Sequence, residues 1–419
     1  MVSKMKFMIR YRFLLAFLAL PIVLASCDSE YSLEGKIINM YGGKQRTNSY
    51  EKYGDFFRFL SYVERPKAKD SSGAIQAPLT ISPLESVIAT REGSISWTGR
   101  YETTWEYKLP EDRVVASTMI ADEEHNIYAV DNRGFIHAIS NKGEKRFEIM
   151  LGDPEETIEI YSDLLALKGS FVAATSNGRI MKCNYEGEID WEYYSNLAPV
   201  SNFAADNDNN VYVPLTNNEF GKTDSLVKIG RKGNEVWKIA FPETRLFRTP
   251  SVGKENILIA GMKEIKGKRL SILYALSYKG EIKWEKQLTV VPRFISIADD
   301  GTIYVVGYNA GVGEAISAVY SFDKDGNLLW DKFFELGVPA PLMISEKVIA
   351  FVGKNQESSG CFFLNRVSGH VEKVVDIESE AFVKLLPSVT PDGRITFATI
   401  DFFGVVRIDD TEINKMLPY

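Results

Sequence analysis

The chain has 419 residues, of which 45% are hydrophobic and 12% aromatic, so it can bury a large core. Its formal net charge is −7, and the first 26 residues carry four basic side chains and no acid, which leaves the remainder at −11. A surface this acidic argues against nucleic acid as a partner.

The first 26 residues have the features of a lipoprotein signal peptide. Four basic residues precede an apolar run at 13–23, which is short for a spanning helix, and Leu24-Ala25-Ser26-Cys27 follows. This tetrad resembles a bacterial lipobox, in which the cysteine is lipidated and becomes the first residue of the mature protein. The resemblance implies a palmitate-type lipid on Cys27 and a membrane-anchored place in the bacterial cell envelope. The body would face the periplasm or the exterior, and the sequence leaves the inner and the outer membrane both open. The alternatives are a simple cleaved signal and an anchor helix.

Residues 27–76 fit no repeat, and we expect a tether followed by an N-terminal segment. The aromatic stretch at 53–63 could form a short helix or an added strand.

From residue 77 to residue 419 one unit is repeated. Five tryptophans mark equivalent places in the units, and four of them follow a glycine by four residues, as Phe147 follows Gly143. Neighbouring units are 42 to 47 residues apart, a period typical of the four-stranded blades of a β-propeller. In the outer strand of a blade, such a tryptophan can cover the gap to the next blade, so we assign a structural role to Trp105, Trp191, Trp237, Trp284 and Trp330.

The second strand of each unit is a nearly continuous apolar run, as expected for a strand between two neighbouring sheets. Seven of these runs lie at 127–130, 171–174, 211–215, 257–260, 303–306, 348–352 and 395–400. We therefore predict an all-β, eight-bladed propeller of four-stranded antiparallel blades, with seven blades as the alternative. The last strand of the eighth blade would come from residues 411–419 or, failing that, from the N-terminal segment.

These units resemble the PQQ-like propeller repeat. Its order of apolar strand, glycine turn and Gly-x-x-x-Trp is matched by residues 301–305, 318–323 and 325–330. Quinone-dependent alcohol and glucose dehydrogenases share this repeat, but many of them carry adjacent cysteines and inserted loops, and this chain has neither. The sequence therefore predicts no cofactor, with PQQ specifically not expected, and no metal.

A second family with this repeat, the outer-membrane assembly lipoproteins of the BamB type, joins a lipidated N-terminal cysteine to a non-catalytic propeller. Resemblance to it implies a monomeric protein-binding platform whose partners are envelope proteins such as the outer-membrane assembly machinery. The alternative is a quinone- or small-ligand-binding envelope enzyme of the PQQ-dependent dehydrogenase kind that uses the axial channel.

The sequence provides few residues for catalysis. The only histidines are His125, His137 and His370, and no two of them have metal-ligand spacing. An arylsulfotransferase-like enzyme would need one of them, but two lie in predicted turns and His137 lies in a strand, where a packed histidine is expected. Cys183 and Cys361 fall in blades three and seven, which are too far apart for a disulfide, so we predict two buried free thiols. The sequence as a whole predicts no catalytic residue.

The connections between second and third strands are the candidate binding loops. They are short in blades two and three and lengthen at 216–224, 262–269, 308–314 and 354–360. Loops on a rigid scaffold commonly carry binding residues, although neutral drift in loop length would give the same pattern. The candidate residues are Asn217, Asn218, Phe220, Lys263, Lys266, Tyr308, Asn309, Asn355 and Gln356.

Overall fold

The computed structural model describes residues 44–46, 49, 62–64, 78–82, 85–99, 103–152, 162–199, 201–217, 222–246, 248–309, 316–335, 341–354, 359–376, 387–389, 395–397 and 406–409. Within these ranges the regular structure is β-strand throughout, with no helix. Accordingly, no described element is a helix that could span a membrane. Residues 1–26, for which the sequence predicts a signal peptide, and Cys27 lie outside the described residues.

The described strands form eight antiparallel sheets, numbered here in chain order. Sheet one contains β2 (Leu79–Thr80), β3 (Ser86–Ala89), β4 (Ser94–Thr98) and β5 (Thr103–Lys108). Sheet two contains β6 (Ile120–Ala121), β7 (Ile127–Val130), β8 (Phe135–Ile139) and β9 (Lys145–Met150). Sheet three contains β10 (Leu165–Leu167), β11 (Ser170–Ala174), β12 (Arg179–Asn184) and β13 (Ile189–Tyr194).

Sheets four and five each have a first strand divided into two short pieces that pair with the same neighbour. Sheet four contains β14 (Ala198–Pro199), β15 (Ala204–Ala205), β16 (Val211–Thr216), β17 (Asp224–Ile229) and β18 (Glu235–Phe241). Sheet five contains β19 (Thr244–Leu246), β20 (Ser251–Val252), β21 (Ile257–Ile265), β22 (Lys268–Leu276) and β23 (Ile282–Leu288).

The last three sheets complete the series. Sheet six contains β24 (Val291–Ile297), β25 (Ile303–Asn309), β26 (Ile316–Phe322) and β27 (Leu328–Phe334). Sheet seven contains β28 (Met343–Ile344), β29 (Val348–Lys354), β30 (Ser359–Asn365) and β31 (Val371–Asp376). Sheet eight contains β32 (Ser388–Val389), β33 (Ile395–Phe397), β34 (Val406–Asp409) and β1 (Tyr62–Glu64).

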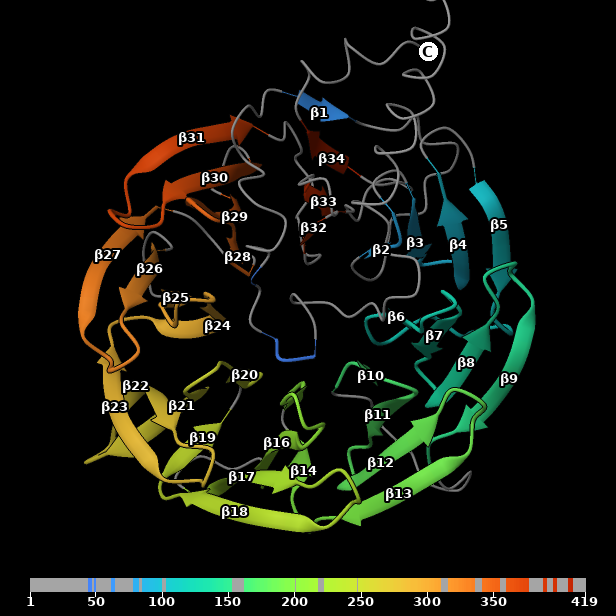
Figure 1. Ribbon diagram of the computed structural model, residues 1–419, viewed down its shortest axis with the longest axis horizontal. Helices are drawn as coiled ribbons and strands as arrows, with labels where there is room; N and C mark the ends of the chain where they lie inside the picture. The colour runs from blue at the N-terminus through green and yellow to red at the C-terminus, as the bar shows by residue number, and fades with distance from the viewer. Residues whose placement is uncertain are drawn as a thin grey trace, which may run out of the picture.

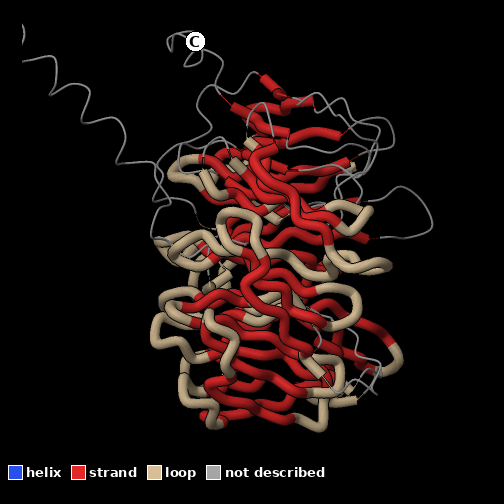
Figure 2. Tube along the Cα trace, turned by 90° about the vertical axis from the view of Figure 1, so that its right-hand side faces the viewer, coloured by secondary structure: helices blue, strands red, loops and turns tan. Residues whose placement is uncertain are grey.

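The sheets stand around a common axis, with the first strand of each innermost and the fourth on the circumference (Figure 1). Seen from the side, strands cross the full thickness of the ring (Figure 2). The predicted all-β propeller is therefore confirmed. The core lies between neighbouring sheets: Leu79 and Val87 of sheet one, for example, pack with Ile127 and Ile139 of sheet two.

Burial follows from this arrangement. The second strands β7, β11 and β16 are buried along their whole length, which explains why their sequences lack polar alternation. The outer strand β13 instead alternates exposed and half-buried residues, because only one of its faces meets the protein. The second strands predicted from apolar runs are confirmed within the described ranges.

The ring is closed by two distant parts of the chain. Strand β1 pairs antiparallel with β34, with Tyr62 opposite Asp409 and Glu64 opposite Arg407. Residues 411–419, the other expected source of this strand, lie outside the described residues. A strand of the segment assigned to residues 27–76 thus joins the last sheet and covers its outer edge.

The repeated tryptophans connect each sheet to the next. The indole Nε1 of Trp237 donates a hydrogen bond to the backbone oxygen of Tyr278, 3.1 Å away in the following sheet. The same turn brings Gly280 against the indole, where an added Cβ would lie 3.0 Å from Trp237 Cδ2. Equivalent hydrogen bonds, of 2.9 to 3.2 Å, are donated by Trp105, Trp191, Trp284 and Trp330. The Gly-x-x-x-Trp pattern therefore encodes a contact between sheets as well as a turn.

Candidate functional site

Residues 44–46 and 49, from the N-terminal part of the chain, lie inside the ring of sheets and are called the channel segment here (Figure 1). Its backbone carbonyls accept hydrogen bonds from the innermost strands. Ala205 N–H of β15 donates to Lys44 O at 2.8 Å, and Val252 N–H of β20 donates to Gln45 O at 2.9 Å. The chain itself therefore bridges sheets four and five at the axis.

Side chains strengthen this attachment. Arg46 is only 2% exposed, and its Nη2 donates to the backbone oxygen of Leu164, at the start of sheet three, at 3.1 Å. Ser251 Oγ donates in turn to Arg46 O at 2.9 Å. Further along, Ser49 forms a parallel bridge with Ile344 of sheet seven. The channel segment thus contacts sheets from three to seven.

The propeller has two faces that differ in their connections. The turn face carries the glycine turns between third and fourth strands, and the loop face carries the connections between second and third strands. Lys44 Nζ donates to Asn209 Oδ1 at 2.6 Å, in a turn-face connection of sheet four. Burial lowers the pKa of Lys44, against the opposing effects of Asp206 and Asp208. The channel segment is therefore held at least in part by the turn face.

No pattern in the sequence predicts the channel segment. Residues 29–49 are polar and contain glycine, which predicted a tether. Most of the observed contacts use backbone oxygens, which every residue supplies, so no side-chain pattern marks them. A buried Arg46 is also contrary to the usual exposure of arginine.

The candidate loop residues are only partly brought together. Asn217 follows β16, and its N–H donates to Asp224 Oδ1 at 3.3 Å. Asn218, Phe220, Asn355 and Gln356 lie outside the described residues. The remaining four candidates lie on sheets five and six.

Lys263 and Lys266 belong to a regular hairpin and not to the irregular loop expected at 262–269. Strands β21 and β22 stay in register up to the pair Ile265 and Lys268, and only Lys266 and Gly267 form the turn. Both turn residues have positive φ, as two-residue hairpin turns of the favoured twist require. Gly267 is the sequence signal for this tight turn, because glycine accepts a positive φ without steric cost.

Tyr308 and Asn309 lie at the loop-face end of β25 beside two arginines. The guanidinium of Arg293 lies over the Tyr308 ring, 4.7 Å from its centroid, and its Nη2 donates to Tyr308 Oη at 3.2 Å. Arg248, from sheet five, donates through Nε to the backbone oxygen of Pro292. Burial, with a further effect from Arg293, lowers the pKa of Arg248 to about 9. Asn309 Nδ2 donates to Thr289 O at 2.9 Å.

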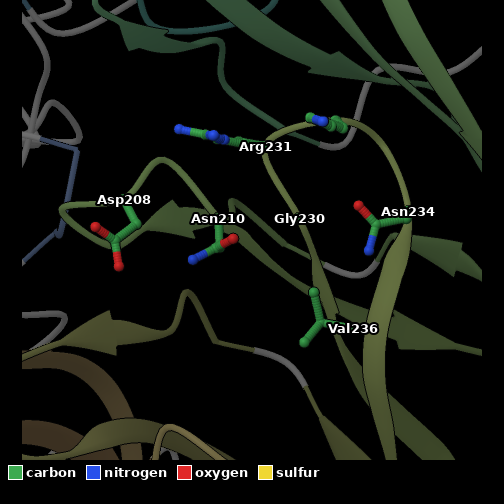
Figure 3. A pocket seen from close by; sticks show the side chains of 7 residues that line it. Asp208, Asn210, Gly230, Arg231, Asn234 and Val236 are labelled. Atoms are coloured by element: carbon green, nitrogen blue, oxygen red, sulfur yellow. The ribbon is translucent and has the colours of Figure 1, made fainter.

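A shallow depression of about 410 Å³ lies on the turn face of sheet four (Figure 3). It is formed by two turns, with Asp208 and Asn210 on one and Arg231 and Asn234 on the other. Side chains of both charges and amide side chains line the depression, so its lining does not favour one chemical class of ligand. It adjoins the place where Lys44 reaches Asn209.

The histidines do not form a shared site. His137 in β8 is 1% exposed, and its Nε2 lies 2.9 Å from Asp131 Oδ2. Asp131 also pairs with Arg113 at 3.2 Å, which makes this a buried structural network. His125 is in a turn with positive φ, and His370 follows a glycine turn. The two thiols, Cys183 and Cys361, are both free and buried, as predicted.

Comparisons with known proteins agree with the fold. Neither a protein-family model nor a curated protein sequence matches this chain. Among solved structures, BamB from Moraxella catarrhalis is similar, with 16% identity, coverage of 83% of this chain and 96% of that one, and a TM-score of 0.58. The quinohemoprotein alcohol dehydrogenase from Comamonas testosteroni has 10% identity, coverage of 87% and 78%, and a TM-score of 0.66. A europium-containing methanol dehydrogenase has 11% identity, coverage of 86% and 89%, and a TM-score of 0.63.

These likenesses define the class of fold. The chain is a β-propeller whose fold is similar to that of BamB and to that of these dehydrogenases, which have PQQ-like propellers. Because one propeller hosts many activities, the function has to be argued from the chain's own surfaces.

Proposed function

We propose that this protein is a lipid-anchored, non-catalytic propeller that binds other proteins of the bacterial cell envelope. The observation that carries the proposal is the channel segment. Its backbone is hydrogen-bonded to the inner strands of sheets four and five, and Arg46 is buried against sheet three. These contacts hold the chain's own residues at the axis. They favour a scaffold that binds its partners through its outer surfaces.

The loop face is the surface that we assign to binding. It carries the long hairpin of β21 and β22, with Ile265 near the tip 40% exposed. Rigid strands that hold an exposed apolar residue between charged ones are suited to a protein partner. Similarity to BamB supports envelope proteins, including the outer-membrane assembly machinery, as the class of partner.

The test is affinity purification of the full lipidated chain from its own membranes after mild crosslinking. The matched variant shortens the hairpin: residues 263–270 are replaced by an Asn-Gly turn between Met262 and Ser271, which face each other in register. We expect a specific envelope protein to be enriched with the unmodified chain and lost with the shortened hairpin. A chain with Lys279→Gln on the turn face is the control and should retain it. No enriched protein, or equal recovery with both variants, would contradict the proposal.

The anchor is tested separately. Cys27→Ser should move the protein from the membrane fraction to the soluble fraction, because one acyl-modified residue is the proposed attachment. Mass spectrometry of the N-terminal peptide should show lipid on Cys27 in the unmodified chain. An unmodified Cys27 in a membrane-bound protein would contradict the lipid anchor.

The alternative, an enzyme that binds a quinone in the axial channel, is favoured by the dehydrogenase neighbours only at the level of fold. The channel segment occupies part of the space that such a ligand would use. Titration of the purified protein with PQQ and Ca²⁺, followed by absorbance, separates the two functions. Saturable binding together with alcohol-dependent dye reduction would establish the enzyme.

A further inference from the structure

Positive charge is concentrated on the loop face of sheets five and six. Residues 243–248, 261–270 and 291–293 contain seven basic and two acidic residues, although the whole chain has a net charge of −7. These three stretches are neighbours in space, since β19 pairs with β21 and β24 begins the next sheet. The chain therefore places a basic surface on an otherwise acidic body.

At the centre of this surface lies Arg293, held in one orientation. Its guanidinium is stacked on Tyr308, and Nη2 donates to the tyrosine oxygen at 3.2 Å. Its Nε is buried and has no hydrogen-bond partner among the described residues. Because Nε is buried, a partner's carboxylate can meet only the exposed part of this half-buried guanidinium, and a planar guanidinium fixed in one orientation is suited to carboxylate oxygens.

A second guanidinium stands beside the first. Arg248 reaches across from sheet five and donates through Nε to Pro292, the residue before Arg293. The positive charge of Arg293 acts on Arg248, and an anion bound near both guanidinium groups would relieve their repulsion. Burial and Arg293 together lower the pKa of Arg248 to about 9, which still leaves it mostly cationic at neutral pH.

The hairpin of β21 and β22 extends the surface outward. Lys263 and Lys266 lie on either side of Ile265, and Lys268 and Arg269 follow on the returning strand. Ile265 is 40% exposed, so the hairpin offers an apolar contact among positive charges. A peptide with alternating acidic and apolar residues complements both features.

We propose that the loop face of sheets five and six binds an acidic peptide segment of a partner protein, with one carboxylate against Arg293 and further acidic side chains along the basic hairpin. This inference rests on the proposed function, because it names the chemistry of the partner at the same face. A polyanionic surface is a poorer fit, because the rest of this acidic chain would be repelled by it.

The test measures fluorescence anisotropy of two labelled peptides, one with four glutamates among leucines and glycines, and one with glutamine at those four places. We expect the acidic peptide to bind and the amide peptide not to bind. Arg293→Gln should weaken binding about tenfold, as expected for loss of a charge-assisted hydrogen bond. Lys263→Gln with Lys266→Gln should weaken it less and mainly at low salt, because those exposed charges are screened.

Two controls keep the outcome interpretable. Lys232→Gln with Lys279→Gln removes the same charge from the turn face and should leave binding unchanged. Arg293→Lys keeps the charge without the planar fork, and thermal unfolding of both Arg293 variants checks that they are folded. Equal binding of the two peptides, or full binding by folded Arg293→Gln, would overturn the proposal. Tighter binding to anionic phosphatidylglycerol vesicles with the same residue dependence would overturn it as well.

The peptide experiment is separable from the crosslinking experiment. If the crosslinked partner is lost on shortening the hairpin but retained by Arg293→Gln, the acidic-peptide inference fails while the binding platform stands. If the hairpin can be shortened without losing the partner, the proposed function fails at this face.

Discussion

Arg46 and Leu164 are separated by 118 positions in the chain, yet the guanidinium of Arg46 donates to the Leu164 backbone oxygen at 3.1 Å. This contact fixes the N-terminal part of the chain on the axis of the ring. Through this hydrogen bond, the inner side of the ring becomes part of the folded core of the protein.

The Arg46 contact should be measurable as stability. We expect Arg46→Ala to lower the free energy of unfolding by about 1–3 kcal/mol, because the buried Leu164 oxygen loses a charged donor. Urea unfolding followed by tryptophan fluorescence measures it. Lys44→Ala, at a half-buried neighbour, should cost less, and equal stability of Arg46→Ala and the unmodified chain would contradict the assigned role.

The contact between Gly280 and Trp237 should respond to a single methyl group. In Gly280→Ala, the new Cβ would lie 3.0 Å from the indole at a φ of +88°, so both strain and a clash oppose folding. Gly267→Ala has a similar φ of +74° with no atom within 4 Å, which isolates the backbone cost of about 1 kcal/mol. We expect thermal unfolding to show a larger loss for Gly280→Ala. Equal losses of thermal stability in the two variants would mean that the Trp237 indole can move away from the new methyl group without destabilising the fold.

The indole hydrogen bond can be separated from the packing of the ring. Trp237→Phe removes the donor to Tyr278 but keeps an aromatic ring, as Phe147 does naturally in sheet two. We expect a loss of about 1 kcal/mol for Trp237→Phe and about 3–5 kcal/mol for Trp237→Ala. Chemical denaturation of both variants tests this. A similar loss in both would show that the hydrogen bond and not the ring carries the contact.

The buried network around Asp131 predicts loss of stability in acid. Burial raises the pKa of Asp131, but hydrogen bonds from His137 and from the N–H groups of Phe135 and Arg133 outweigh it, so the pKa is lowered overall. A lowered folded-state pKa stabilises the fold above the unfolded value of about 3.8, and the contribution is lost as the pH falls through the folded value. Asp131→Asn should therefore be less stable at pH 7 and have a shallower decline below pH 4. A parallel decline in both proteins would contradict this.

The two thiols should be inert in the folded protein. Burial raises the pKa of Cys183 to about 11, and it also raises that of Cys361. We expect the thiols of the folded Cys27→Ser protein to react slowly with a disulfide reagent at pH 8. Once the protein is unfolded in urea, both remaining thiols should react. Rapid stoichiometric reaction of the folded chain would show that at least one thiol is accessible.

The parts of the fold that repeat could be predicted from the sequence, and the parts that occur once could not. The apolar run at 127–130 coincides with β7 because a strand between two sheets needs apolar residues on both faces. The channel segment occurs once, and its backbone hydrogen bonds place no demand on side-chain type. Strand β1 is three residues long, so the sequence could offer the N-terminal segment as one of two sources of the last strand of the eighth blade but could not choose between them.

The candidate site was located by loop length, which indicated the face but not the chemistry. Tyr308 was chosen because it lies in a lengthened connection, and the structure adds the two arginines beside it. Arg248 and Arg293 are 45 residues apart, about one repeat, but they lie in first strands or the connections leading into them, which neither the apolar second strands nor the tryptophan turns mark. Their approach depends on the packing of sheets five and six, which only the three-dimensional arrangement reveals.

The pairing of β1 with β34 also constrains the order in which the protein can be made. Tyr62 leaves the ribosome 347 residues before its partner Asp409. Strand β1 therefore has no pairing partner until β34 has been synthesised. Contacts between such distant residues form slowly, and an exposed strand edge invites pairing with the wrong chain in the meantime. A chain truncated before residue 406 would lack β34 and leave the ring open, so closure of the ring depends on residues that are made long after most of the sheets.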